Sequence, residues 1–255
     1  MQKKTNIVLG RNPVLEALLS GQPIDKIYVQ TGSHGSAIQK IYQLSKPQKI
    51  PVVQAPRAKI EMFSDGGKSQ GVVAIISPVS YILLENLVDK VQRGGDIPNF
   101  LILDRITDPH NLGAIIRSAE VFGCQGIIIS HRESSPITEV VVKSSAGAIF
   151  NLDICKVGNL NQALKYLKNC GVWIFSTSSH SEKSLWKMDF TTPQAVIIGS
   201  EGKGVRPLLL NESDDSFRIP QTGKTESLNV SVAAGIVLGE ILRQRTGFAR
   251  SPDSD

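Results

Sequence analysis

The sequence predicts an α/β protein with a parallel sheet in its C-terminal part and a smaller α/β domain before it. Three observations support this fold class. Apolar strand-like runs alternate with helical patterns from residue 99 onward, and such alternation is typical of a parallel sheet covered by helices on both faces. A weaker alternation fills residues 1–78. Turn-forming residues at 93–98 separate the two parts.

The N-terminal domain is expected over residues 1–78. Pro13 stands near the first position of a predicted helix that ends at Leu19. The remaining pattern predicts strands at 24–29, 50–53 and 72–76 and a helix at 38–44. Residues 79–97 are expected to connect the domains, with a possible helix at 84–91.

The C-terminal domain is expected over residues 98–250. Its first strand, Phe100 to Leu103, is wholly apolar, as strands buried on both faces are. The pattern then predicts strands at 126–130, 172–176 and 195–199 and helices at 111–122, 160–168 and 228–245.

Composition limits the possible functions. The net charge is +5, and residues 1–78 hold ten Lys and Arg against four Asp and Glu, a local excess of +6. Such an excess suits RNA phosphates or a merely solvated surface. We expect no membrane span, because no apolar run of about 18 residues exists. Three scattered cysteines indicate neither disulfides nor a metal site, so we expect a cytoplasmic protein.

Three motifs carry polar groups at strand ends. In the first, residues 104–117, Asn111 is suited to capping a helix, and Gly113 is expected to leave open space beside Arg117, which could grip a phosphate. An ordinary capped helix with a surface arginine remains the alternative. In the second, residues 197–205, glycines around Glu201 could let a ligand approach the backbone, or form only a flexible turn.

The third motif, residues 217–221 and 226–235, leads from a strand end into a helix rich in small residues. Either Ser227 or Asn229 could cap this helix. A capped helix with a purely structural role is the alternative. No motif matches a P-loop, and the dinucleotide-binding glycine fingerprint is missing from the first strand–helix turn of the C-terminal domain.

Taken together and in this order, the motifs resemble the SpoU-type, TrmH-like branch of the SPOUT RNA 2′-O-ribose methyltransferases. The resemblance rests on Asn111 with Arg117, on residues 199–202 and on residues 227–231, and it covers about residues 98–246. It implies a C-terminal trefoil knot, S-adenosylmethionine as cofactor and a homodimer whose two subunits complete the active site. The cofactor residues that it implies are Thr177, Gly199, Ile219 and Leu228.

The N-terminal segments 10–18 and 70–74 resemble the ribosomal-protein-like substrate-binding domain of the same family. This resemblance implies that Arg11 contacts RNA and that the substrate is a guanosine of large-subunit (23S) rRNA. A tRNA ribose methyltransferase with the same core remains an alternative. A non-catalytic RNA-binding protein involved in ribosome assembly is another, and a Rossmann-type dehydrogenase is a distant third.

The catalytic residues expected from this resemblance are Arg117, Asn111, Glu201 and Asn229. We expect Arg117 to hold an RNA phosphate and to stabilise the alkoxide that forms on the ribose. Glu201 is expected to orient Arg117 or Asn111, while Ser227 and Asn229 fix the ribose. No metal is expected to take part.

Overall fold

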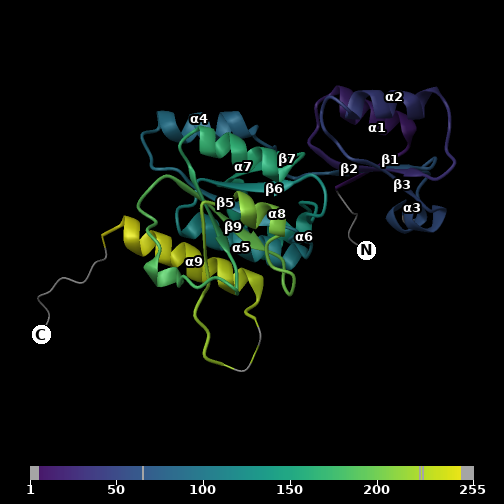
Figure 1. Ribbon diagram of the computed structural model, residues 1–255. Coiled ribbons are helices and arrows are strands. Elements are labelled where there is room, and N and C mark those ends of the chain that lie inside the picture. The colour runs from purple at the N-terminus through teal and green to yellow at the C-terminus, as the bar shows by residue number, and fades with distance from the viewer. Residues whose placement is uncertain (1–5, 65, 224, 226, 248–255) are drawn as a thin grey trace, which may run out of the picture. The chain divides into compact units, whose positions relative to one another are not determined.

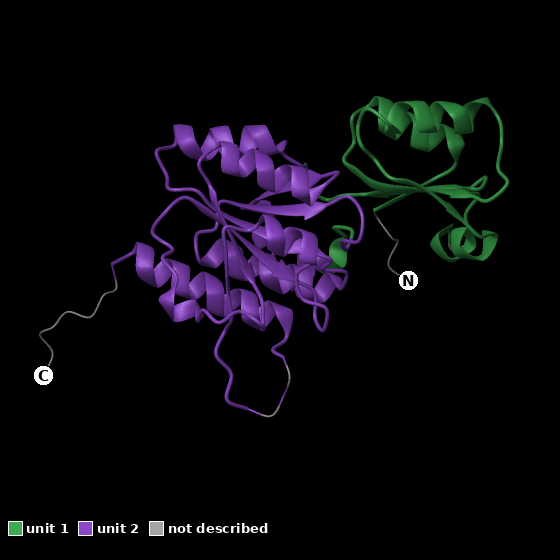
Figure 2. Ribbon diagram, in the orientation of Figure 1, with its two compact units in different colours: residues 1–80, 136–140 green, residues 81–135, 141–255 purple. Residues whose placement is uncertain are grey.

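The computed structural model describes residues 6–64, 66–223, 225 and 227–247, so the expected domain ends at residues 1 and 250 lie outside it. The chain divides into two compact units (Figure 2). Unit 1 comprises residues 1–80 with 136–140, and unit 2 comprises residues 81–135 with 141–255. The short second segment belongs to unit 1 partly because Ile137 N donates to the buried Asp25 Oδ2 at 2.7 Å.

Unit 1 is built on a four-stranded sheet of order β1-β4-β2-β3. The β1–β4 and β4–β2 pairs are antiparallel, and β2 pairs with β3 in parallel. Its elements are β1 (Ile7–Leu9), α1 (Arg11–Leu19), β2 (Ile24–Gln30), α2 (Ser36–Ser45), β3 (Val52–Ala55), α3 (Arg57–Ser64) and β4 (Val72–Ile76).

Each face of this sheet has its own apolar core. Helices α1 and α2 cover one face, where Val14, Ile27 and Ile41 are fully buried. Helix α3 covers the other face (Figure 1). There Phe63 stacks on Tyr28 with ring centroids 5.0 Å apart. Burial on both faces explains why β4 reads as an almost continuous apolar run.

Unit 2 is built on a six-stranded, wholly parallel sheet of order β10-β8-β9-β5-β6-β7. Its strands are β5 (Asn99–Asp104), β6 (Gly126–Ser130), β7 (Asp153–Val157), β8 (Trp173–Thr177), β9 (Gln194–Gly199) and β10 (Asp215–Phe217). Its helices are α4 (Leu84–Arg93), α5 (Pro109–Val121), α6 (Glu139–Ser144), α7 (Leu160–Asn169), α8 (Pro207–Glu212) and α9 (Val230–Arg245), with short 3-10 turns η1 (Ala148–Phe150) and η2 (Leu185–Lys187). The first two residues of α6 belong to the segment 136–140 of unit 1.

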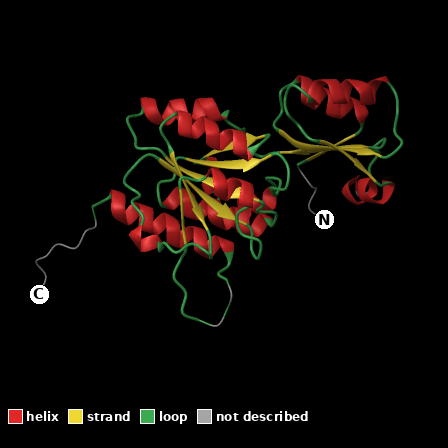
Figure 3. Cartoon of the chain, in the orientation of Figure 1, coloured by secondary structure: helices red, strands yellow, loops and turns green. Residues whose placement is uncertain are grey.

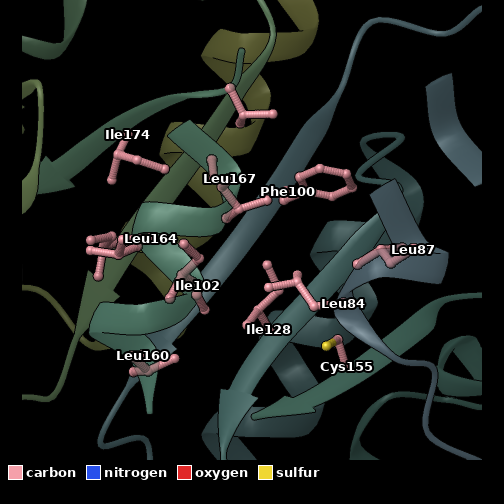
Figure 4. Close-up of a cluster of buried hydrophobic side chains, with 14 of the residues drawn as sticks. Leu84, Leu87, Phe100, Ile102, Ile128, Cys155, Leu160, Leu164, Leu167 and Ile174 are labelled. Carbon is pink, nitrogen blue, oxygen red and sulfur yellow. The ribbon is translucent and has the colours of Figure 1, made fainter. Parts of the chain in front are cut away.

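Helices cover both faces of this sheet (Figure 3), as the alternation in the sequence predicts. On one face, side chains of α4 and α7 pack over the central strands; Leu87, Leu164 and Ile102 are fully buried there (Figure 4). Residues 84–93 lie in the segment expected to connect the domains, yet the apolar side of α4 forms part of this core. None of the helices within the described residues is long and apolar enough to span a membrane.

Helices α5 and α9 lie side by side on the other face. A Cβ built on Gly235 would lie 3.8 Å from Ser118 Oγ, and one on Gly239 would lie 3.8 Å from the Phe122 ring. These contacts advance in the same direction along both helices, so the two helices run parallel. The first turn of α5 therefore lies beside the first turn of α9.

Candidate active site

The polar residues of all three motifs follow strands that meet at one edge of the parallel sheet. β5 and β9 pair in register from Asn99 with Gln194 to Asp104 with Gly199. The chain proceeds from β5 to β6 and β7 in one direction and then returns through β8 and β9 to the other side of β5. Such a reversal leaves a crevice at the carboxyl ends of the strands, where ligands of α/β proteins bind.

Asn111, Glu201 and Asn229 form one hydrogen-bonded cluster at this edge, which we call the carboxyamide cluster. Asn229 Nδ2 donates to Glu201 Oε1 at 2.6 Å and to Asn111 Oδ1 at 3.0 Å. Asn111 Nδ2 donates to Glu201 Oε1 at 3.4 Å. Residues separated by up to 118 positions are thus brought into contact. All three motifs contribute one side chain to the cluster.

Asn229 also caps helix α9, as expected for one of two candidate residues. Its Oδ1 accepts from Ser231 N at 2.9 Å and from Ser231 Oγ at 2.6 Å. Glu201 Oε1 accepts from Val230 N at 3.1 Å, so a carboxylate satisfies a backbone donor at the positive end of the helix. The helix start therefore fixes both Asn229 and Glu201. Ser227, the other candidate cap, is exposed two residues earlier.

Asn111 does not cap α5, which corrects the prediction from the first motif. The N-cap is Asp108, whose side chain accepts from His110 N at 3.0 Å, and Pro109 occupies the first helical position. Proline suits that position because its missing N–H would have no partner in the helix. Asn111 therefore lies inside the first turn of the helix, where its amide is free to join the cluster.

Gly113 does not leave open space beside Arg117, and this interpretation was wrong. A Cβ at Gly113 would lie 1.9 Å from Ser144 Oγ and 2.9 Å from Ser145 N. The space is filled by the end of helix α6, whose Ser144 Oγ also donates to Pro109 O at 3.2 Å. Gly113 is required for close packing within unit 2.

Arg117 is exposed and lies outside the carboxyamide cluster. It follows Asn111 by six residues, or about 9 Å along the helix axis. Its guanidinium makes no hydrogen bond to another described residue. Glu201 thus orients Asn111, and it does not contact Arg117.

A network of charged side chains holds the loop after β9. The sequence motifs did not predict this network. Asp104, fully buried at the end of β5, accepts from Arg206 N at 2.9 Å and pairs with Arg206 Nη2 at 2.7 Å. Arg105 Nη2 donates to Gly204 O at 3.1 Å. A charged residue that ends an otherwise apolar strand is the sequence signal that could have revealed this network.

Gly199 is required by the fold of the loop itself. A Cβ at Gly199 would lie 2.1 Å from Gly204 C and 2.2 Å from Val205 N. The loop folds back on the strand, with Gly204 N donating to Ser200 O at 2.9 Å. This fold directs Glu201 toward the start of α9.

The other residues expected to bind the cofactor follow neighbouring strands. Thr177 ends β8, and its Oγ1 donates to Ile197 O of β9 at 3.2 Å. Ile219 follows β10, and Leu228 precedes Asn229; both are partly buried. Next to Thr177, the buried Ser176 Oγ has no hydrogen-bond partner among the described residues. Apolar side chains and strand-end polar groups thus occur together at this edge.

Arg11 lies in unit 1, at the start of α1. Its Nε donates to Gln70 O at 3.1 Å and its Nη1 to His34 O at 3.2 Å. It therefore joins two loops of the unit. It also lines a hollow of about 640 Å³, together with Arg57 and Gln30.

The comparisons with known proteins agree with this geometry. The model of the SpoU rRNA methylase family matches residues 98–239. The chain belongs to the SpoU family. A second model, described as RNA 2′-O-ribose methyltransferase substrate binding, matches residues 7–82. The family expected from the three motifs is confirmed, and this SpoU-family protein is an RNA 2′-O-ribose methyltransferase.

Relatives and solved structures are similar over most of the chain. A Bacillus subtilis protein whose name places it in the TrmH family of tRNA/rRNA methyltransferases is 36% identical over 96% of this chain and 98% of its own length. The AdoMet-bound rRNA methyltransferase from Sinorhizobium meliloti is 25% identical, with a TM-score of 0.58, over 94% and 87% of the two chains. The TrmH/SpoU tRNA-modifying enzyme of A. aeolicus is 30% identical, with a TM-score of 0.54, over 68% and 90%.

Proposed function

We propose that this protein methylates the ribose 2′-oxygen of a guanosine in large-subunit rRNA, with S-adenosylmethionine as methyl donor. The observation that carries the proposal is the carboxyamide cluster of Asn111, Glu201 and Asn229 at the reversal point of the parallel sheet. The family uses S-adenosylmethionine, and the neighbour from Sinorhizobium meliloti was crystallised with it. When bound, the cofactor supplies an activated methyl group on a sulfonium.

The residues at this edge fit such a cofactor. The partly buried Ile219 and Leu228 offer apolar contact to a flat ring. Thr177 and Gly199 end adjacent strands, and backbone groups at these strand ends can hydrogen-bond to the edge of that ring. The unpartnered, buried Ser176 Oγ adds an unused polar group beside Thr177. We propose that these residues hold the cofactor and that the chain around them forms a trefoil knot.

The cluster is suited to orienting a ribose. Asn111 keeps one amide hydrogen and one lone pair unused, and its rotation is fixed by Glu201 and Asn229, so it can bind a ribose without reorganisation. Asn229 uses both its amide hydrogens and both its lone pairs, so it holds Asn111 and Glu201 in place. Glu201 Oε1 accepts three hydrogen bonds, which makes this carboxylate a positioning group. Ser227, exposed just before the cluster, is proposed to contact the same ribose.

Arg117 is proposed to bind the RNA phosphate and to stabilise the developing alkoxide. A ribose hydroxyl is a weak acid, and an arginine keeps its proton, so charge stabilisation is the role that its chemistry allows. Its guanidinium is exposed and unpaired among the described residues, so no internal ion pair has to be broken for it to reach RNA.

A homodimer is proposed through the outer side of α5 and α9. Three exposed apolar side chains lie on elements that pack together there: Val121 on α5, Phe150 on η1 and Val232 on α9, each at least half exposed. Because Arg117 lies on the same helix as Val121, a partner on this face would meet Arg117. We therefore propose that the dimer completes the active site.

The choice of rRNA rests on the N-terminal unit. Residues 7–82 match the substrate-binding model, and residues 1–78 carry the local charge excess of +6. Binding to an RNA backbone depends on such excess Lys and Arg. Arg11 and Arg57 line the hollow of unit 1 and are proposed to contact RNA. Because the proposed substrate is ribosomal RNA, we propose that the protein acts in the cytoplasm. A tRNA substrate is the second candidate, because the similar A. aeolicus protein is described as tRNA-modifying.

The experiment is a mass-spectrometric map of ribose methylation in rRNA and tRNA from cells with and without the gene. We expect one 2′-O-methylguanosine of large-subunit rRNA to disappear and to return with the wild-type gene. Arg117→Ala should not restore it, whereas Lys143→Ala, which changes a cation outside the site, should. Loss of a tRNA methyl group instead would identify the second candidate.

A calorimetric titration separates catalysis from a purely structural role. The wild-type protein and Arg117→Ala are both expected to bind S-adenosylmethionine, because Arg117 lies outside the proposed cofactor residues. No binding by the wild-type protein would favour a non-catalytic RNA-binding function. Normal methylation by Arg117→Ala with intact cofactor binding would contradict the role given to this arginine.

A further inference from the structure

A second pocket lies at the same sheet edge, at the carboxyl ends of β6 and β7. It has a volume of about 260 Å³ and lies wholly within unit 2. Arg132 and Glu133 follow β6, Asn159 caps helix α7, and Arg206 and Leu208 belong to the start of α8. None of these residues belongs to the carboxyamide cluster or to the proposed cofactor site.

The pocket combines an apolar wall with a free cation. Leu209 is buried, whereas Leu208 beside it is 59% exposed, so the pocket presents an apolar side chain to an incoming ligand. Arg132 is exposed, and its guanidinium makes no hydrogen bond within the described residues. A planar guanidinium and an apolar side chain are the two surfaces on which unstacked RNA bases pack.

Glu133 gives the pocket a hydrogen-bond acceptor in a fixed orientation. Its Oε2 accepts from Arg206 Nη1 at 3.1 Å, and Arg206 is itself held by the buried Asp104. Its Oε1 accepts no hydrogen bond from a described residue. Glu133 also adopts a φ of +57°, a left-handed conformation that costs free energy for a residue other than glycine. Such strain is concentrated at functional sites.

The charges favour a base over a phosphate. Glu133 and Asp104 neutralise Arg206, which leaves Arg132 as the remaining cation, beside an exposed carboxylate. A phosphate would be repelled by Glu133. A base with amino donors would not be, and guanine alone presents two adjacent donors, its ring N–H and its exocyclic amine, on one edge.

We propose that this pocket binds a guanine of the RNA substrate, with Glu133 accepting from its Watson–Crick edge and Arg132 stacking on its face. The proposal rests on the proposed function, because it adds a base-reading subsite to the same RNA-binding edge. β6 and β7 are the first and second neighbours of β5, so the pocket lies about 5–10 Å along the sheet edge from the end of that strand. A guanine bound there is the base of the methylated nucleotide or of its neighbour.

The test is a fluorescence-anisotropy titration of the full-length protein with labelled octauridine carrying one central guanine, inosine or adenine. Inosine lacks the exocyclic amine. We expect the wild-type protein to bind the guanine oligonucleotide about 10-fold more tightly than the inosine one, because inosine loses one hydrogen bond to the Glu133 carboxylate. Glu133→Gln should lose this ratio. Glu182→Gln, which changes an exposed carboxylate outside the pocket, should keep it.

Two further variants separate the possible outcomes. Arg132→Ala should weaken binding of all three oligonucleotides alike, because stacking does not depend on the base. Arg117→Ala should lose methyl transfer and keep the guanine-to-inosine ratio. A wild-type protein without this ratio, or a Glu133→Gln protein that retains it, overturns the proposed pocket. A protein that keeps the ratio but methylates no RNA overturns the proposed function instead.

Discussion

Replacing Asp104 by asparagine should destabilise unit 2 and displace the loop that carries Glu201. The substitution keeps the side-chain volume, removes the charge and replaces one acceptor oxygen by an amide donor. Asp104 is fully buried and accepts from Arg206 N while pairing with Arg206 Nη2. In the variant, one amide oxygen can still accept from the backbone N–H. The guanidinium of Arg206 then faces an amide donor and loses its nearest carboxylate.

The magnitude follows from the burial of the two partners. Removing one partner of a fully buried ion pair costs about 3–5 kcal/mol. The Arg206 side chain is 34% exposed and keeps Glu133 as a second partner at 3.1 Å, so solvent and Glu133 compensate part of this loss. We therefore expect the free energy of unfolding to fall by about 2 kcal/mol.

Urea unfolding followed by tryptophan fluorescence measures this change. Both tryptophans of the chain, Trp173 and Trp186, lie in unit 2, so the signal reports this unit alone. The matched control is Asp153→Asn, which removes a more exposed pair with Lys90 and should cost less than about 1 kcal/mol. Methyl transfer should also fall in the Asp104 variant and not in the control. A loss at Asp104 no larger than that of the control would refute the reasoning.

Three further predictions use the same fluorescence assay. Gly113→Ala should destabilise unit 2 by about 1–3 kcal/mol, because its methyl group would overlap Ser144; equal stability would show that α6 can move aside. Arg245→Met should lower the free energy of unfolding by about 2 kcal/mol or more, because the Arg245 guanidinium donates to the carbonyls of residues 97, 98, 190 and 192. A loss of less than about 0.5 kcal/mol would contradict this role. Hydrogen bonds from Arg243 lower the pKa of Glu240 below its ordinary value of 4.5. The wild-type protein should therefore exceed Glu240→Gln in stability at pH 7, and this difference should shrink as the pH falls below about 4.5 and through the lower folded-state pKa; a constant difference would exclude the carboxylate as its source.

The buried strands of unit 2 could be predicted because both their faces are covered. β5 and β6 read as continuous apolar runs, and every residue in them is buried. β7 was missed, and of β10 only the end, at residue 217, was expected. β7 lies at a sheet edge with Asp153 and Lys156 only partly buried, and β10, at the opposite edge, is three residues long. These edge strands are less completely buried than the central ones, so their sequences lack a continuous apolar run.

In unit 1, the second predicted strand, at residues 50–53, began two residues before β3, and α3 was missed. Ile50 and Pro51 precede β3 and are partly buried, and Pro51 O still accepts from Ile27 N of β2 at 2.9 Å. α3 is only eight residues long and buries few of them, so its helical period is weak. Short elements that pack against one face of a small sheet owe their structure to tertiary contacts more than to local pattern.

Residue types at strand ends predicted the members of the cluster but not their contacts. Asn111, Glu201 and Asn229 were expected to act together, and they do share hydrogen bonds. The role of Gly113 was misread because sequence spacing along one helix says nothing about what packs on that helix. Ser144 belongs to α6, which comes later in the sequence, and only the folded structure brings its side chain against Gly113.

A loop that carries a positioning carboxylate must be as rigid as the elements around it. Asn111 lies in a helix and Asn229 caps one, whereas Glu201 lies on the loop between β9 and α8. That loop is fastened at both ends, by the backbone contact of Gly199 with Gly204 and by the pairing of Asp104 with Arg206. Arg206 also binds Glu133 in the second pocket. Base binding at Glu133 would therefore act on the same anchor that fixes Glu201, so a change of base at that position should alter the rate of methyl transfer as well as the affinity for RNA.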